Sequence, residues 1–374
     1  MGIKEADLHI TKVCGGHCGY CYVDPHDDLL VPKSVFCHQP DFGHTGVLKC
    51  VIDAIRNIAG AEDLVLVGGD PCRHPDIVPL LKRAKELGLN TVVLSNTHAY
   101  RCGGHLVSMP EVTPLLDEID FTLHGSSARI HNTFNQSNGS YQMATERIKE
   151  FMLFRKPGQS VGIILNMVPE IIDDLPAIME NIIGDLEMNP DYDFFSIQRI
   201  APSGKARLEY DRWRIDRDMV ERAFGVFDDI KNRYGIETKA CIDAFPWCAV
   251  PEKYWNYLES LRGGCNWGKP GGVLSVLMDG TLQRCALSER DLGINILNID
   301  TPEDFDSLYL NNPALRAFNE HRHLDDKCLK CELLEKCGGG CTIAGGIGKG
   351  DPYEKFNPLD PIASVIKGHD YLAT

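Results

Sequence analysis

Three cysteines near the start of the chain constrain its structure more than any other feature. Cys14, Cys18 and Cys21 belong to the run CGGHCGYC at positions 14–21, which follows a short segment of alternating apolar residues. Cysteine thiolates are the usual ligands of iron–sulfur clusters, and this spacing suits three corners of one [4Fe–4S] cube, leaving one iron without a protein ligand. A zinc site is the alternative, because zinc in a closed site takes four ligands and His17 is a candidate fourth.

The remaining cysteines also favour metal binding. The chain has 15 cysteines in 374 residues, and six of them lie between positions 265 and 341. The N-terminal sequence MGIKEADLHI has no signal-peptide apolar region, and no apolar run reaches the roughly 18 residues of a membrane span. We therefore expect a cytoplasmic protein with no membrane partner. Because the cytoplasm keeps thiols reduced, clustered cysteines there indicate metal ligation.

Composition limits the other partners. The net charge is −15, which argues against a nucleic-acid partner because contacts to phosphates require a surplus of Lys and Arg. The hydrophobic content of 43% and the charged content of 24% are ordinary for a globular protein. The length allows two domains, or one large domain with an appendage.

Residues 6 to about 200 alternate strand-like and helix-like segments. Continuous apolar strands that alternate with amphipathic helices indicate a parallel sheet built from βα units. We expect an α/β fold, a partial (β/α)6 TIM-like barrel, because six units fit the length better than eight. Strands are expected at 6–13, 63–67, 91–94, 119–123, 161–167 and 193–200, and helices at 77–87 and from about 140 to 151.

The alternation stops near residue 201. Residues 211–235 are expected to form one long helix, and the region from 263 onward is rich in Gly and Cys, with a short strand at 273–278. We therefore divide the chain into a barrel (1–205), a helical bridge (206–262) and a cysteine-rich domain (263–374).

The N-terminal cysteine pattern, with the aromatic Tyr20 just before its third cysteine, resembles the signature of the radical S-adenosylmethionine (SAM) enzymes. The resemblance implies that the unliganded iron chelates the amino and carboxylate groups of SAM. An electron from the cluster then cleaves SAM to methionine and a 5′-deoxyadenosyl radical, which abstracts a hydrogen atom from the substrate.

Other segments resemble the SAM contacts of that family. Active sites of parallel barrels lie at the carboxyl ends of the strands, and the cysteine loop and two polar segments all follow expected strands. Where the family usually has Gly-Gly-Glu-Pro, this chain has Asp70 as the acid; a simple turn is the alternative interpretation. The residues implied in SAM binding are Tyr20, Gly68, Gly69, Asp70, Pro71, Ser95, Asn96, Thr122, Asn166 and Gln198. The alternative for the polar strand-end residues is solvation alone.

The C-terminal cysteines resemble a SPASM domain, the extension of radical SAM enzymes that carries up to two auxiliary [4Fe–4S] clusters. The resemblance rests on Cys265-x14-Gly280-x4-Cys285 and on Cys328-x2-Cys331-x5-Cys337-x3-Cys341. By analogy, Cys265, Cys285 and Cys341 bind the first auxiliary cluster, and Cys328, Cys331 and Cys337 bind the second.

Each auxiliary set then lacks a fourth cysteine. Ala363 stands near the place of the usual last cysteine. Asp360 is one substitute ligand, Cys248 is another for the first cluster, and an iron open to substrate is the third option. The unassigned cysteines are Cys37, Cys50, Cys72, Cys102 and Cys241. They are expected to be buried small side chains, although one of them, Cys102 first, is a candidate hydrogen-atom donor.

Most SPASM relatives modify ribosomally made peptides, so a peptide is the expected substrate, with cross-linking, epimerisation or side-chain oxidation as the reaction. Ala286 follows Cys285 where sulfatase-modifying relatives carry Asp, which argues against that activity. Only 13 residues precede Cys14, so leader recognition is expected on another surface or a separate protein. Oxidation or rearrangement of a small molecule is the enzymatic alternative, and an iron–sulfur electron carrier or zinc scaffold is the non-enzymatic one. The electron donor implied is a flavodoxin or ferredoxin.

Overall fold

The computed structural model describes residues 2–22, 42–96, 109–240, 245–260, 265–288, 291–321, 324, 326–341 and 343. Within these ranges a ten-stranded sheet organises the fold, in the order β10-β9-β8-β1-β2-β3-β4-β5-β6-β7. The strands are β1 (Glu5–Thr11), β2 (Asp63–Gly68), β3 (Asn90–Ser95), β4 (Glu118–Thr122), β5 (Ser160–Met167), β6 (Phe194–Arg199), β7 (Glu237–Ala240), β8 (Val273–Val276), β9 (Thr281–Gln283) and β10 (Asp291–Asn295).

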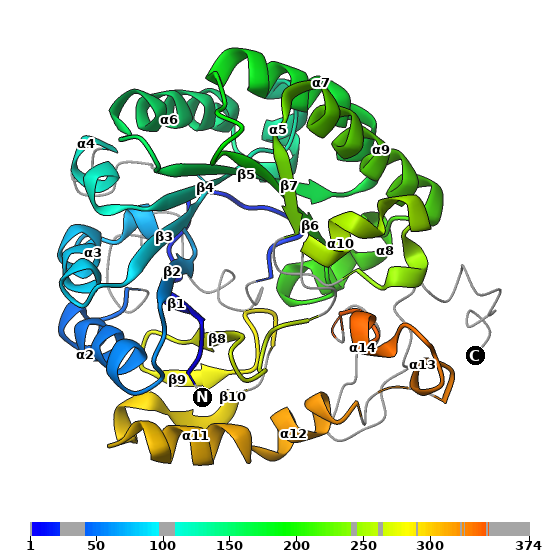
Figure 1. The fold of residues 1–374 in the computed structure, drawn as a ribbon. Helices are drawn as coiled ribbons and strands as arrows, with labels where there is room; N and C mark the ends of the chain where they lie inside the picture. The colour runs from blue at the N-terminus through cyan, green and yellow to red at the C-terminus, as the bar shows by residue number, and fades with distance from the viewer. Residues whose placement is uncertain are drawn as a thin grey trace.

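The helices cover the outside of this curved sheet, where α2, α3, α6, α7 and α9 follow one another around the strands (Figure 1). They are α2 (Thr45–Asn57), α3 (Ile77–Glu86), α4 (Met109–Val112), α5 (Ala128–Asn135), α6 (Ser140–Phe154), α7 (Pro169–Leu186), α8 (Tyr210–Trp213), α9 (Arg217–Tyr234), α10 (Trp255–Ser260), α11 (Pro302–Leu310), α12 (Pro313–Asn319), α13 (Asp326–Leu329) and α14 (Leu334–Cys337). Among the described residues, no helix is long and apolar enough to cross a membrane.

The sheet confirms the expected α/β fold and partial barrel. Strands β1 to β6 pair in parallel and in sequence order, with helical segments between them. The structure extends this core at both edges, because β7 pairs with β6 and β8 pairs with β1, both in parallel. In the described part of the chain the barrel is open, since β7 and β10 are the two edge strands.

The local signals in the sequence correspond to observed packing. The expected helix at 77–87 is α3, and its apolar face (Ile77, Leu80, Leu81 and Ala84) is buried. Gly88 follows with φ +73°, the left-handed conformation in which glycine commonly ends a helix. Helical periodicity and a glycine stop were therefore sufficient to place this element.

The prediction of a single helix at 211–235 is wrong. The segment forms two helices, α8 and α9, and Arg214 between them is extended. Asp216 begins the second helix as its N-cap, with a side-chain oxygen that accepts a hydrogen bond from Met219 N–H at 2.8 Å. The first N–H groups of a helix have no hydrogen-bond partner within it, and a capping aspartate accepts a bond from one of them. The Asp216 cap therefore marks the start of a new helix.

Strand β8 joins the cysteine-rich region to the barrel. It pairs with β1 from Glu5↔Val273 to Leu8↔Val276, and β9 pairs with β8 in antiparallel orientation. The boundary expected near residue 263 therefore separates two parts of one continuous sheet. This continuity joins the hairpin between Cys265 and Cys285 to the strand that leads into the N-terminal cysteine loop.

The inner face of the sheet is more polar than the outer face. On β1, Ala6, Leu8 and Ile10 belong to the hydrophobic core, so the alternate residues Asp7 and His9 point to the opposite face. Asp7 is buried, and burial raises the pKa of its carboxyl well above the ordinary value. Burial also lowers the pKa of His9 to about 4.

Asp120 on β4 provides a test of this polar interior. Burial, and then the charge of Glu118, raises the pKa of its carboxyl well above 3.8. The folded protein therefore retains a proton that the unfolded chain releases, so stability falls as pH rises from about 4 through the raised pKa. We expect Asp120→Asn to raise the free energy of unfolding by about 1–3 kcal/mol at pH 8, and by less at pH 5.

Urea unfolding at the two pH values measures this difference. The exposed Asp191→Asn is the matched control, and it should change stability equally at both pH values. A destabilisation by Asp120→Asn at pH 8 would contradict the inference that the buried Asp120 carboxyl is neutral.

Candidate active site

The loop after β2 lies directly on the segment that leads into the cysteine loop. Gly69 N–H donates to the Thr11 carbonyl at 2.7 Å, and Asp70 N–H donates to the Val13 carbonyl at 2.8 Å. A Cβ on Gly68 would lie 2.1 Å from the Thr11 oxygen, and one on Gly69 would lie 2.3 Å from the Val13 oxygen. Two glycines are therefore required here because two backbones touch.

Asp70 organises the rest of this loop. Its carboxylate accepts hydrogen bonds from Cys72 N–H at 3.1 Å and from the Ser95 hydroxyl at 3.0 Å. Pro71 is buried and begins a short 3₁₀ turn, for which Asp70 is the N-cap. The expected segments after β2 and β3 are thus joined through one carboxylate.

The N-terminal cysteines are half-buried, and the pKa values of two of their thiols are raised. Burial, followed by the charge of Asp70, raises the pKa of Cys14 to about 12. Burial, followed by the charges of Cys21 and Cys14, raises the pKa of Cys18. The three thiolates therefore repel one another, and a cationic metal centre would relieve this repulsion. The residues fit an iron–sulfur cluster for this reason.

Neighbouring amides support the cysteine sulfurs. Asn96 Nδ2 donates to Cys14 Sγ at 2.7 Å, and Gly16 N–H lies 3.4 Å from the same sulfur. The Cys18 thiol donates to Asn135 Oδ1 at 3.2 Å. Hydrogen bonds to sulfur ligands tune the potential of iron–sulfur clusters. Asn96 was expected from the sequence to contact SAM, and the structure gives it this bond to Cys14.

Tyr20 connects the cysteine loop to the neighbouring strands. Its hydroxyl is hydrogen-bonded to His124 Nε2, and Asn166 Nδ2 lies 3.3 Å from His124 Nδ1. The Tyr20 ring also packs edge-on against Trp213, with the ring centroids 5.8 Å apart. Tyr20 and Asn166, both expected at the site, are therefore brought together through His124.

A second series of polar contacts begins at the His124 backbone. The His124 N–H donates to His131 Nδ1 at 3.0 Å, and His131 Nε2 lies 2.6 Å from Asn135 Nδ2. The Asn135 carbonyl accepts from His17 N–H at 3.0 Å. Sequence reasoning missed His124 and Asn135. His124 has a signal, because it lies two residues beyond a barrel strand, whereas Asn135 lies on α5 and only its tertiary contacts identify it.

The last expected SAM contacts lie at strand ends. Asn166 on β5 is the register neighbour of Gln198 on β6, and the half-buried Thr122 ends β4 beside Ile164. Among the described residues, no side-chain hydrogen bond joins Thr122 or Gln198 to the cysteine loop.

The segment after β6 closes over the cysteine loop from the other side. The backbone N–H groups of Lys205 and Ala206 both donate to the Cys21 carbonyl, at 2.8 and 3.3 Å. The Ser203 hydroxyl donates to the Leu287 carbonyl at 2.8 Å. The Tyr22 hydroxyl donates to the Gly68 carbonyl at 3.4 Å. This segment therefore ties the cysteine loop to the C-terminal region.

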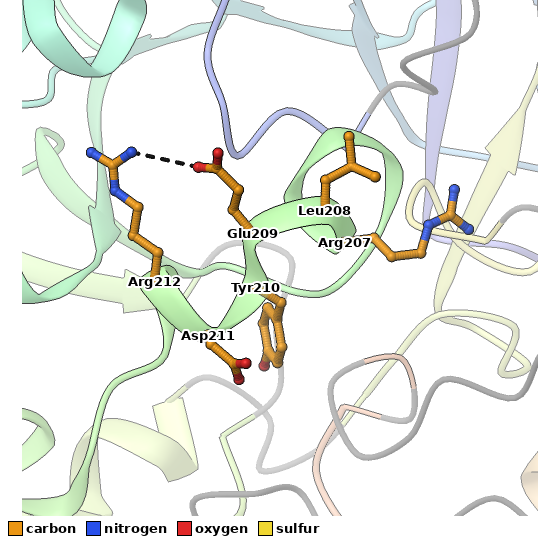
Figure 2. A pocket seen from close by; sticks show the side chains of 6 residues that line it. All are labelled: Arg207, Leu208, Glu209, Tyr210, Asp211 and Arg212. Atoms are coloured by element: carbon orange, nitrogen blue, oxygen red, sulfur yellow. Dashed lines mark hydrogen bonds and ion pairs between the residues drawn. The ribbon is translucent and has the colours of Figure 1, made fainter.

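An open pocket of about 540 Å³ follows this segment. It is lined by one stretch of chain, Arg207, Leu208, Glu209, Tyr210, Asp211 and Arg212, and Figure 2 shows the two arginines pointing to opposite sides. Arg212 pairs with Glu209 at 3.5 Å. Both side chains of this pair are exposed, so the pocket is a surface feature and not part of the buried site. Exposed ion pairs of this kind contribute little to stability.

The first C-terminal cysteine set packs in one cluster near the half-buried Arg284. Cys285 and Cys341 share a buried cluster, and Cys265 packs against it. Burial opposes the charge of Arg284, but the nearby thiolates of Cys285, Cys265 and Cys341 raise its pKa above the ordinary value. The guanidinium therefore lies near these sulfurs, and it is 4.7 Å above the Phe318 ring.

The second set forms a separate group. Cys331 N–H donates to the Cys328 carbonyl at 3.0 Å, and Trp247 N–H donates to Cys337 Sγ at 3.4 Å. Cys328 is buried with Leu324, and Cys248 packs against this pair. The structure thus places Cys248 with the second set, whereas the sequence offered it as a ligand for the first.

Other cysteines have simpler surroundings. Cys50 is exposed on α2, and Cys72 is buried. Cys37, Cys102, Cys241, Asp360 and Ala363 lie outside the described residues. Among the described residues, no group of three His, Cys, Asp or Glu side chains is arranged to hold a single metal ion. A multi-iron cluster distributes its ligands over several irons and does not require that convergence.

No protein-family model matches the chain, but individual relatives match most of its length. The AdoMet-dependent heme synthase of Oleidesulfovibrio alaskensis is 23% identical over 368 residues, covering 93% of this chain and 86% of that protein. The PqqA peptide cyclase of a Methylobacterium species is 23% identical over 314 residues, covering 80% of this chain and 75% of that protein.

Solved structures show the same fold. SuiB of Streptococcus suis bound to S-adenosylmethionine has a TM-score of 0.68 and 16% identity, covering 97% of this chain and 77% of that one. Native anSMEcpe with bound AdoMet and Cp18Cys peptide has a TM-score of 0.65 and 13% identity, covering 97% and 95%. Together with the cysteine loop and its setting, the relatives in sequence support a radical SAM enzyme, and the solved structures share its fold. Enzymes of this class use SAM with an iron–sulfur cluster.

The contact between the two backbones can be tested at Gly69. We expect Gly69→Ala to displace the cysteine loop, because the added Cβ would lie 2.3 Å from the Val13 carbonyl. The variant should bind less iron after anaerobic reconstitution and unfold at a lower temperature, at a cost of roughly 1–3 kcal/mol. Iron analysis and thermal unfolding measure both effects.

The matched control is Gly184→Ala on α7, where a new Cβ meets nothing within 4 Å. It should keep its iron and gain up to about 1 kcal/mol, since alanine favours helix. Equal iron contents in the two variants would show that the close approach does not position the loop.

Proposed function

We propose that this chain is a peptide-modifying radical SAM enzyme with a C-terminal auxiliary-cluster region. The observation that carries the proposal is a backbone contact: the glycine loop after β2 is hydrogen-bonded to Thr11 and Val13, just before the three half-buried cysteines that follow β1. Cys14, Cys18 and Cys21 would hold the SAM-binding cluster. When bound, the cluster and SAM supply a 5′-deoxyadenosyl radical that removes a hydrogen atom from an unactivated C–H bond.

The surrounding residues position these groups. The backbone of Gly68 and Gly69 lies against the cysteine loop, where it would meet SAM. Asp70 and Ser95 hold that loop through their hydrogen bond, and Asn96 stabilises the Cys14 thiolate. We assign Tyr20, Thr122, Asn166 and Gln198 to the walls of the SAM site. Burial excludes water, which protects a reactive intermediate from side reactions.

His124 acts as a positioning residue in this scheme. It is 1% exposed and is bonded to Tyr20 on one side and Asn166 on the other. Its backbone is held by His131. A histidine fixed on both ring nitrogens keeps one orientation, so it would keep the Tyr20 ring against the cluster loop.

The substrate class is supported by the relatives. One is a PqqA peptide cyclase, and the structural neighbours include SuiB bound to the precursor peptide SuiA and anSMEcpe with a bound peptide. We therefore propose a ribosomally made peptide, modified by cross-linking, epimerisation or side-chain oxidation. A small-molecule substrate is the second candidate, because the AdoMet-dependent heme synthase is equally similar in sequence.

The other parts of the chain complete the proposal. Residues 1–205 form the catalytic barrel, 206–262 the bridge and 263–374 the SPASM domain. Cys265, Cys285 and Cys341 would bind one auxiliary cluster, and Cys328, Cys331 and Cys337 would contribute to another. A flavodoxin or ferredoxin would donate the electron.

SAM cleavage tests the central assignment. The full chain is reconstituted anaerobically with ferrous iron and sulfide and reduced with dithionite, and 5′-deoxyadenosine is measured. We expect replacement of Cys14, Cys18 and Cys21 by alanine to lower the rate by at least about 100-fold, the upper range for loss of a supporting group at a metal site. Cys50→Ala, at an exposed position on α2, should leave it unchanged. Undiminished cleavage in the triple variant would refute the assignment.

The substrate class is tested with peptides encoded near the gene. A peptide substrate should gain or lose mass, or become cross-linked, only with SAM and reductant, as read by tandem mass spectrometry. It should also increase 5′-deoxyadenosine formation. If all such peptides stay unmodified while a porphyrin or sugar is oxidised, the second candidate is correct.

A further inference from the structure

We propose that Cys248 is the fourth thiolate ligand of the second auxiliary site, beside Cys328, Cys331 and Cys337. The inference rests on the proposed function only in taking that site to hold an iron–sulfur cluster. It assigns the missing ligand to a segment 80 positions upstream of the set, and not to the C-terminal tail where the sequence pattern would place it.

The backbone beside Cys248 lies against the second cysteine set. Trp247 N–H donates to Cys337 Sγ at 3.4 Å. Gly340 approaches Pro246 so closely that an added Cβ would lie 3.3 Å from the proline ring, and its φ of +81° belongs to the region that favours glycine. The turn after Cys337 is therefore shaped to receive this upstream segment.

The Cys248 side chain points into the same group. Leu324 and Cys328 form a small buried cluster, and the partly buried side chains packed against it are Cys248 and Leu334. Cys328 is also joined to Cys331 by the hydrogen bond between their backbones. Cys248 thus packs with Cys328, and the two other cysteines of the set are bonded to its neighbours, Cys331 to Cys328 and Cys337 to Trp247.

The segment is rigid enough to serve as a ligand support. Trp247 is 1% exposed, and its carbonyl accepts from Trp255 Nε1 at 3.1 Å and from Val250 N–H at 3.2 Å. The Lys336 ammonium lies 5.1 Å above the Trp247 ring. Ligands held by packing and hydrogen bonds bind metal more tightly than ligands on loose loops.

The first auxiliary set has different neighbours. Cys265, Cys285 and Cys341 pack with Ala201, Trp267 and Tyr22. Arg284 lies near these three sulfurs, and its half-buried guanidinium already supplies positive charge there. Cys248 belongs to the other buried cluster, so packing separates the two sites.

A fourth thiolate changes what the second site can do. Soft sulfur donors suit iron–sulfur clusters better than a carboxylate oxygen, and four of them close the site. A closed cluster has no iron open to a substrate atom. The second site would therefore not hold the substrate, in contrast to the N-terminal cluster.

The test compares metal content in the full chain with Cys14, Cys18 and Cys21 replaced by alanine, so that only auxiliary sites bind. The protein is reconstituted with ferrous iron and sulfide and mildly oxidised, and iron and zinc are counted. Adding Cys248→Ala should remove between about one iron, the labile corner, and about four, the whole cluster. Cys50→Ala should remove none.

Double variants identify the site that is affected. Because one [4Fe–4S] cluster holds four irons, Cys248→Ala with Cys328→Ala should remove no more than about four. Combined with Cys265→Ala, it should remove as much iron as the two single variants remove together, since two clusters are then affected. The reverse pattern, or an iron content equal to that of the Cys50→Ala control, overturns the proposal. So does the absence of iron and zinc from the second site.

Thiol protection provides a measurement that needs no variant at Cys248. In the loaded wild-type chain, Cys248 should resist alkylation by iodoacetamide, and it should react after chelation removes the metal. Cys50 should react in both states. Equal reactivity of Cys248 with and without metal overturns the proposal. SAM cleavage by the wild type is scored separately, so that failure of the proposed function is distinguished from failure of this ligand.

Discussion

The contact between the backbone of Gly68–Gly69 and that of Thr11–Val13 determines the rest of the active site. Two strands of a parallel sheet normally diverge into separate loops, but here the loop after β2 donates hydrogen bonds to the chain that leaves β1. Any side chain at either glycine would collide with a carbonyl oxygen. This contact fixes the point from which the cysteine loop starts, and therefore where its three thiols lie.

Polar contacts then extend from that point across the barrel. Tyr20 reaches His124 beyond β4, His124 reaches Asn166 on β5, and Asn135 on α5 returns to Cys18. Buried polar groups are costly unless they are paired, so each link restrains the next. The network explains how a loop of small residues acquires a defined shape before any cofactor binds. It also joins residues more than 100 positions apart into one wall.

Packing separates the C-terminal cysteines into two groups. Strand β8 pairs with β1, and the segment after β6 contacts both Cys21 and Leu287, so the C-terminal region is anchored beside the N-terminal loop. Within it, one cysteine set lies near the half-buried Arg284, and Cys337 of the other accepts a hydrogen bond from the Trp247 backbone N–H. A guanidinium and a backbone N–H exert different fields on nearby thiolates, so the two sites would differ in potential.

The sequence by itself determined the parallel barrel and the local motifs, because apolar periodicity, glycine stops and cysteine spacing act over a few residues. It predicted a SAM contact at Asn96, and the structure gives that residue a hydrogen bond to Cys14. It failed where a distant partner decides the outcome: it merged α8 with α9, and it missed His124 and Asn135. Only the tertiary structure showed that Asp70 and Ser95 are bonded and that Cys248 lies with Cys328. Such pairings are made by packing between segments far apart in the chain, and the spacing of residues within one strand or loop does not predict them.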